Sequence, residues 1–343
     1  MTLHASLKRL FWNRIRPAYL AVVGWLSQLL RRIAPPFANG LEIVAYDVAE
    51  QLRHSKSARA STASLNVRGV RFNLSIVANH PHAYEQYMKI AANGDAYEPV
   101  MVECLTRILR EVNEPAFIDI GAFMGFYACY VSALLKDLEP TYAIESNPRY
   151  VEAIRRSATL NGFSRLMIYE AALSDRLENV GIEGETILFG GQGANGARTT
   201  TLDDLCQRER IRPKVVKIDV HGAEGKVLGG MRQVLRDSIE FVLLEVHPAD
   251  YLKRYSGMCR ADILTILEQS GLHLFYVAGH RYRRSDGLQQ FLESGTFAYR
   301  RLDESTKDLL LFDRHVDIFV LGSKVADLEP ILGASRMDPA LAR

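Results

Sequence analysis

The sequence predicts an α/β protein with a mostly parallel, doubly wound sheet that ends in an antiparallel pair of strands. From residue 115 onward, short apolar runs alternate with helix-like segments, which is typical of strand–helix–strand units. Two late apolar runs, 272–277 and 316–321, predict the antiparallel pair. Ligands of such sheets bind beyond the carboxyl ends of the strands, so we expect the site there.

Composition and charge exclude several classes of protein. The chain has 343 residues, of which 48% are hydrophobic and 24% charged, as in globular proteins. Its net charge is 42 − 40 = +2, which predicts no nucleic-acid partner. None of the four cysteines forms a C-x-x-C pair, which predicts a reduced, cytoplasmic compartment without structural zinc.

The first 36 residues differ from the rest. No acidic residue precedes Glu42, whereas lysines and arginines flank an apolar stretch at residues 18–30. That stretch is shorter than the about 20 residues that a membrane-spanning helix needs. A cleavable signal peptide would need a small-x-small site, and none follows clearly. Two alternatives remain: a segment in peripheral contact with an anionic membrane surface, or a terminus that is poorly ordered or packs on the domain.

Local patterns predict the individual elements. Residues 64–76 alternate around Gly69 and predict a hairpin, residues 100–112 a helix, and residues 181–196 a hairpin or mobile loop. Asp203 and Asp204 are expected to cap a helix that ends near residue 210. The parallel strands are predicted at residues 117–120, 141–145, 165–170, 214–219 and 241–246. The helices between and after them are predicted at residues 149–160, 225–235 and 260–270.

The stretch Phe117–Tyr127 carries the first chemical signal. It reads as a buried strand with Asp119, followed by a turn with Gly121 and Gly125 and then a helix. Dinucleotide binding needs G-x-G-x-x-G, which is absent, so a nicotinamide dehydrogenase is disfavoured. An acid in this turn is suited to a cation such as the ammonium group of S-adenosylmethionine.

Acids follow the other strands as well. Glu145 ends the second strand, where a carboxylate accepts hydrogen bonds from both ribose hydroxyls. Ala172 and Asp175 follow the third strand and are expected to flank an adenine. Asp219 ends the fourth strand, and the fifth carries Glu245 and His247 at its end.

These motifs together resemble the FkbM family of S-adenosylmethionine-dependent methyltransferases over about residues 97–250. The segments that carry the resemblance are Phe117–Gly125, Ala143–Pro148, Asn161–Gly162, Ala172–Asp175, Thr201–Asp204 and, most distinctively, Lys217–Glu224. The resemblance implies a Rossmann-like class I methyltransferase fold and O-methylation of a hydroxyl on a sugar, lipid or secondary metabolite. The implied organisation is a basic apolar segment 1–36, an entry subdomain 37–112 of helices and a hairpin, a methyltransferase domain 113–325 and a tail 326–343.

The same resemblance and the positions at the strand ends give a predicted site. The predicted cofactor-binding residues are Asp119, Gly121, Ala122, Gly125, Glu145, Ser146, Ala172, Asp175 and Asp219. The predicted catalytic residues are Asp219, His221, Glu224 and His247. The two histidines are candidate general bases because imidazole accepts a proton near neutral pH. Asp219 and Glu245 would suit Mg²⁺, but two acids and a turn are a weak signal, so no metal is predicted.

Two residues depart from the family's pattern. Phe123 stands in the cofactor turn where the family usually has asparagine, and His221 stands where an acid is common. Phe123 raises the alternative that the chain is a non-catalytic or scaffolding relative that keeps the fold without the reaction.

Overall fold

The computed structural model describes residues 61–77, 97–183, 186–189, 196–279, 285–303 and 317–335, with single residues and short pieces between 80 and 91. The predicted membrane-contact segment, residues 1–36, lies outside the described residues. Contacts divide the chain into two compact units, residues 1–60 with 78–83 and residues 61–77 with 84–343. The sheet and its helices belong to the second unit.

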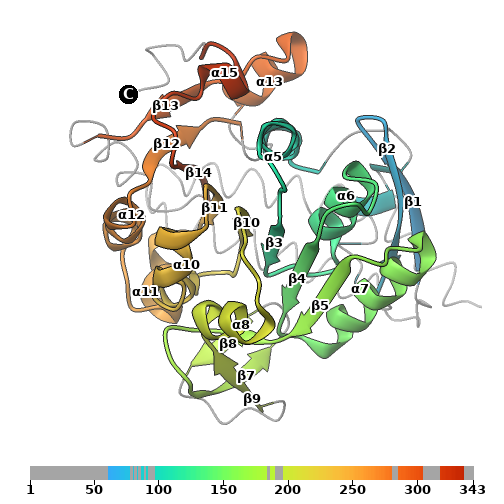
Figure 1. Ribbon diagram of the computed structural model, residues 1–343, viewed down its shortest axis with the longest axis vertical. Helices are drawn as coiled ribbons and strands as arrows, with labels where there is room; N and C mark the ends of the chain where they lie inside the picture. Colours follow the sequence, from blue (N-terminus) through green and yellow to red (C-terminus); the bar gives the residue numbers. More distant parts are fainter. Residues whose placement is uncertain are drawn as a thin grey trace, which may run out of the picture. The chain divides into compact units, whose positions relative to one another are not determined.

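An eight-stranded sheet organises this unit, in the order β13-β12-β14-β11-β10-β3-β4-β5 (Figure 1). The five parallel strands are β5 (Leu166–Glu170), β4 (Thr141–Glu145), β3 (Phe117–Ile120), β10 (Val215–Ile218) and β11 (Phe241–Val246). The antiparallel strands are β14 (Ile318–Ser323), β12 (His273–Val277) and β13 (Tyr299–Arg301). The predicted Rossmann-like class, with its antiparallel C-terminal pair, is confirmed, and β13 extends that pair by one strand.

Helices cover the sheet, and the alternation of side chains along each strand determines which residues face them. The helices of the described chain include α5 (Pro99–Glu111), α6 (Phe126–Leu134), α7 (Pro148–Asn161), α8 (Leu202–Glu209), α9 (Glu224–Gly229), α10 (Arg232–Asp237), α11 (Ala249–Tyr255), α12 (Arg260–Gln269), α13 (Ser285–Ser294) and α15 (Glu329–Leu332). Ile120 and Ile218 pack into one apolar core with the residues of α8 to α12. Side chains alternate across a strand, so Asp119 and Lys217 point to the other face, where α6 lies.

A hairpin precedes the sheet, as predicted. Strands β1 (Ser61–Val67) and β2 (Val70–Ile76) pair antiparallel around Gly69, and β2 packs on α6 and α7. The Ser75 N–H donates to Ser157 Oγ at 2.8 Å, which ties β2 to α7. A second, four-stranded sheet follows β5 and contains β6 (Ala172–Leu173), β9 (Gly196–Thr200), β7 (Asn179–Glu183) and β8 (Thr186–Phe189). The β7–β8 hairpin begins at Asn179 and overlaps the segment 181–196, for which a hairpin or mobile loop was predicted.

Two local predictions were wrong. The single helix predicted at residues 225–235 is two short helices, because the chain at Gly230 passes so close to another segment that a Cβ there would lie 2.0 Å from the Ser174 carbonyl oxygen. The cap of α8 is Thr201, whose hydroxyl accepts the Asp204 N–H at 3.0 Å. Asp203 instead accepts the N–H groups of Gln233 and Val234 at the start of α10.

Two further features concern the apolar character of the helices and the state of the cysteines. Among the described helices, none combines the length and the apolar character that crossing a bilayer requires. The four cysteines are free thiols, with Cys104, Cys129 and Cys206 buried and Cys259 exposed.

Candidate functional site

The predicted site residues meet where the parallel strands end. Asp219 directly follows β10, and its N–H donates to Ile120 O of β3 at 3.1 Å. The N–H groups of Gly121 and Ala122 both donate to Ile144 O of β4, at 3.0 and 3.1 Å. The turn after β3 is therefore fastened by backbone hydrogen bonds to the strands on both sides.

The two glycines of this turn are required by the backbone conformation and by packing. Gly121 has a φ of 74°, and a Cβ there would lie 1.8 Å from the Asp219 carbonyl oxygen. Gly125 has a φ of 81° and caps α6, and its missing Cβ makes room for Ile154 of α7. A side chain at either position would strain the backbone and push neighbouring segments apart.

Glu145 is held in place by backbone donors. Its Oε2 accepts the Phe123 N–H at 2.8 Å, and its Oε1 accepts the Asn147 N–H at 2.8 Å. The Ser146 hydroxyl donates to Oε1 at 3.5 Å. The residue is 7% exposed, so both oxygens are oriented in a buried position.

Phe123 takes part through its backbone. Its φ is 52°, the left-handed region that asparagine adopts more readily than phenylalanine. Its N–H nevertheless reaches Glu145, and its ring packs edge-on against Tyr150 with the centroids 4.6 Å apart. The departure from the family's asparagine therefore leaves the contact with Glu145 intact.

A buried row of charges crosses from β3 to β10. Lys217 Nζ lies 3.5 Å from Asp119 Oδ1 and 3.5 Å from Asp219 Oδ2. Burial lowers the pKa of Lys217, but the carboxylates around it prevail and raise that pKa above its usual value. Burial raises the pKa of Asp119, and Lys217 reduces this rise only in part. The ammonium group therefore stays charged between two acids.

Lys217 and Glu98 were missed by the sequence analysis. Lys217 Nζ lies 5.0 Å from the centre of the Tyr127 ring, and the Tyr127 hydroxyl donates to Glu98 Oε2 at 2.7 Å. Glu98 itself is 4% exposed and has a φ of 52°. The available signal was a lysine at an inward-facing position of an otherwise apolar strand, because such a charge needs a buried partner.

A second buried cluster lies at the ends of β10 and β11. His247 is 3% exposed, and its Nδ1 lies 2.7 Å from Glu224 Oε1. Its Nε2 lies 3.8 Å from Asp219 Oδ1 and 3.8 Å from Glu245 Oε1. Burial lowers the pKa of His247, but Glu224 outweighs it, with help from the other two acids, and raises the pKa to about 10. With Nδ1 engaged by Glu224 and the ring buried, His247 is poorly placed for the general-base role predicted for it.

His221 stands beside this cluster. Its ring centroid lies 4.9 Å from that of His247. The turn that presents it is sharp, since His221 and Gly222 have φ values of 49° and 98°. Glu224 Oε1 also accepts the Gly222 N–H at 3.1 Å, so one carboxylate fixes both the turn and His247.

Comparison with known proteins finds methyltransferases. Residues 119–282, just under half of the chain, match the sequence model of the Methyltransferase FkbM domain. This part of the chain is therefore similar to FkbM methyltransferases. It is 27% identical over 173 residues to the hexuronic acid methyltransferase AglP of Haloferax volcanii, an alignment that covers 48% of this chain and 66% of that protein. The chain thus spans just under two thirds of this relative.

Solved structures of methyltransferases are similar at low identity. The methyltransferase FkbM of Methylobacillus flagellatus is 14% identical with a TM-score of 0.38, over 62% of this chain and 45% of that chain. A SAM-dependent O-methyltransferase of Thermotoga maritima is 11% identical with a TM-score of 0.35, over 67% and 66% of the two chains.

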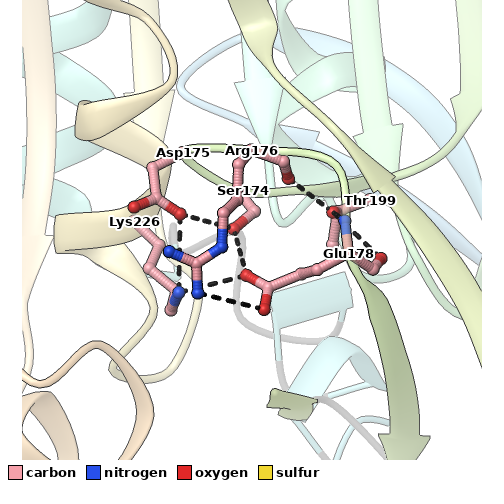
Figure 2. A network of polar contacts seen from close by, with 6 residues as sticks. All are labelled: Ser174, Asp175, Arg176, Glu178, Thr199 and Lys226. Carbon is pink, nitrogen blue, oxygen red and sulfur yellow. Dashed lines mark hydrogen bonds and ion pairs between the residues drawn. The ribbon is translucent and has the colours of Figure 1, made fainter. Parts of the chain in front are cut away.

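Asp175 belongs to a third network of polar contacts, with partners other than those of the two buried clusters. Asp175 Oδ1 lies 3.4 Å from Lys226 Nζ, which also lies 3.1 Å from Glu178 Oε1 (Figure 2). Burial raises the pKa of Asp175, but Lys226 and the Ser174 hydroxyl outweigh it, so the pKa is lowered. Ala172 is 1% exposed within β6. The position of this pair beside an adenine stays a prediction.

The chemistry of the site fits a cationic ligand. Around Lys217 and His247, the acidic side chains outnumber the basic ones; these acids are Glu98, Asp119, Asp219, Glu224 and Glu245. Among the described residues, neither carboxylate oxygen of Asp119 accepts a hydrogen bond within normal reach, although its ion pair with Lys217 remains. Buried acids in excess are costly unless positive charge is supplied, so these residues fit a cofactor with sulfonium and ammonium groups.

Proposed function

We propose that the chain is an enzyme that transfers a methyl group from S-adenosylmethionine to a hydroxyl group of a sugar, lipid or secondary metabolite. The observation that carries the proposal is Glu145, whose two oxygens are oriented by backbone N–H groups at the end of β4. A carboxylate held in this way accepts hydrogen bonds from the two hydroxyls of a ribose. The match to the FkbM domain supports methyl transfer as the reaction.

In this proposal, the residues of the first buried row bind the amino-acid part of the cofactor. Asp119 and Asp219 lie on either side of Lys217 and would attract an ammonium group, while Lys217 would attract a carboxylate. When bound, the cofactor supplies a methyl group on a positively charged sulfur, which makes it ready for transfer. The tasks left to the protein are to align the acceptor oxygen, to exclude water and to remove a proton.

Among the predicted bases, we propose that His221 removes the proton from the acceptor hydroxyl. His247 is buried, and its Nδ1 is engaged by Glu224 Oε1 at 2.7 Å. His221 is half-buried on the turn after β10, two residues after Asp219 in the chain, so its ring would be accessible to an acceptor. Asp219, Glu224 and His247 would then position this turn.

The reaction is tested with the purified chain and S-adenosylmethionine that carries a labelled methyl group. Candidate acceptors are small glycans, lipids and hexuronic acids, the last suggested by the name of the relative AglP. We expect label in an acceptor, and a large loss of kcat without loss of cofactor affinity in His221→Ala. Absence of cofactor binding at millimolar concentration would contradict the proposal and favour a non-catalytic relative.

We further propose a cytoplasmic protein whose residues 1–36 contact an anionic membrane. The proposal follows from the basic residues that flank the apolar stretch 18–30. The test is flotation with vesicles that contain anionic lipid, using the full chain and a variant that lacks residues 1–36. Equal flotation of the two proteins would contradict it.

A further inference from the structure

We propose that Asp219, His221 and His247 bind a divalent transition-metal ion, which deepens the proposed function and rests on it for its role. Each residue offers one ligand atom, and these atoms all lie within 4.8 Å of one another. Two of the residues follow β10 and the third follows β11, neighbouring parallel strands whose carboxyl ends face the site. Two imidazoles and one carboxylate are a ligand set that such ions favour.

The second observation is the orientation of His247. Its Nδ1 is engaged by Glu224 Oε1 at 2.7 Å, so Nε2 is the nitrogen that faces Asp219. Metal-binding histidines have this arrangement, because a carboxylate on one ring nitrogen fixes the tautomer and directs the other nitrogen to the ion. Glu224 is fully buried, and it also accepts the Gly222 N–H, so one carboxylate supports both His247 and the turn that carries His221.

The third observation is the space between the ligand atoms. Asp219 Oδ1 and His247 Nε2 are 3.8 Å apart, too far for a hydrogen bond. Among the described residues, no hydrogen bond reaches Asp219 Oδ1, although this atom is buried from solvent. Two atoms bound to one ion at about 2.0–2.2 Å lie about 3–4 Å apart, so the gap has the width that a shared ion requires.

The ligand set also selects the ion. Mg²⁺ and Ca²⁺ prefer sites made of oxygen atoms, whereas imidazole suits Zn²⁺, Fe²⁺, Ni²⁺ and Cu²⁺, and the carboxylate of Asp219 also suits Mn²⁺. No metal was predicted from the sequence because the only ligands weighed were Asp219 and Glu245, and the only ion was Mg²⁺. Three protein ligands would leave positions open for an acceptor. A hydroxyl bound to such an ion would lose its proton more readily, so in this proposal His221 acts as a ligand in place of its role as the base.

The test measures binding of Mn²⁺ alone to the full chain after treatment with a chelator. Calorimetry and the electron paramagnetic resonance signal of free Mn²⁺ both report binding, and neither depends on activity. We expect one site per chain, with at least about 10-fold weaker binding in His221→Asn and in Asp219→Asn, and 10- to 100-fold weaker binding in Glu224→Gln. Asparagine suits position 221 because it tolerates a positive φ.

The matched control is His273→Asn. His273 lies on β12, which β14 separates from β11, and its Nδ1 contacts Arg301 at 2.8 Å. Its replacement should leave Mn²⁺ affinity unchanged. Thermal unfolding followed by circular dichroism identifies any variant that fails to fold, and Asp219→Asn and His221→Asn serve as independent tests of the same site.

Two results would overturn the metal site. One is wild-type protein that does not bind Mn²⁺ or Zn²⁺; the other is His221→Asn with wild-type affinity for Mn²⁺. Cofactor binding is measured in the same metal-free protein. If S-adenosylmethionine binds and methyl transfer proceeds without metal, the ion has no role in the reaction and His221 acts as a base. If the cofactor does not bind but Mn²⁺ does, the proposed function fails and the metal site stands.

Discussion

The two halves of the site are built by different interactions. At β3 and β4, the site is positioned by the backbone. N–H donors orient Glu145, and the missing side chain of Gly121 lets the turn approach the end of β10. At β10 and β11, side chains hold one another through buried charges, as Glu224 and His247 do at 2.7 Å. Where backbone groups position the site, the side chain can vary, as Phe123 shows. Where buried charges position it, the structure depends on each charged partner.

The largest effect should follow from breaking a pair in the charged half. Glu224→Ala leaves His247 buried without its main partner, so we expect a loss of about 3–5 kcal/mol in the free energy of unfolding. Urea denaturation measures it. The control is Glu152→Ala, which removes an exposed helical pair with Arg156 and should cost about 0.3–0.5 kcal/mol. Similar losses in the two variants would show that the charged half is not specially sensitive.

Gly121→Ala tests the point where the two halves touch. The added Cβ would lie 1.8 Å from the Asp219 carbonyl oxygen, so the turn or the end of β10 must move. We expect a loss of about 2–3 kcal/mol, together with weaker cofactor binding. Gly69 has a similar φ of 87°, but a Cβ added there would have no atom within 4 Å. Gly69→Ala should therefore lower the free energy of unfolding only by the conformational strain, about 1–2 kcal/mol. An equal cost at both positions would argue against close contact between the halves.

Lys226→Ala tests a network outside both halves (Figure 2). Lys226 lowers the pKa of Asp175 and of Glu178, and carboxylates with lowered pKa stabilise the fold above their unfolded pKa values of about 3.9 and 4.3. This stability is lost as the pH falls through the folded pKa values. We expect the variant to be less stable than wild type by about 0.5–1 kcal/mol at pH 7, after allowance for partial exposure, and by less near pH 3. A difference that grows on acidification would contradict the assignment.

The smallest effect is expected for Phe123→Asn. The contact with Glu145 comes from the backbone N–H of residue 123, and asparagine tolerates its φ of 52°. Affinity for S-adenosylmethionine should therefore change by less than about 3-fold, or about 0.6 kcal/mol. Calorimetric titration measures this. A much larger gain in affinity would mean that the phenylalanine ring obstructs the site.

The same difference between the halves explains what the sequence could predict. The parallel strands, the glycine turn and Glu145 follow from patterns within a few residues, and the structure has these strands close to the predicted bounds. The partners of Lys217 and Glu224 were not predictable, because they depend on which strands become neighbours: Lys217 aligns with Asp119 of β3, and Glu224 meets His247 at the end of β11. Likewise, the break between α9 and α10 depends on contact of Gly230 with the distant Ser174.

Glu145 is proposed to bind S-adenosylmethionine, and one calorimetric titration tests this claim. Wild-type chain, Glu145→Gln and the surface control Glu152→Gln are each titrated with the cofactor. Glu145→Gln removes a charged acceptor worth about 1.5–3 kcal/mol, so we predict binding weakened by about 10- to 100-fold, with wild-type affinity in the control. Equal affinity in wild type and Glu145→Gln, or no binding in the wild-type chain, would contradict the claim.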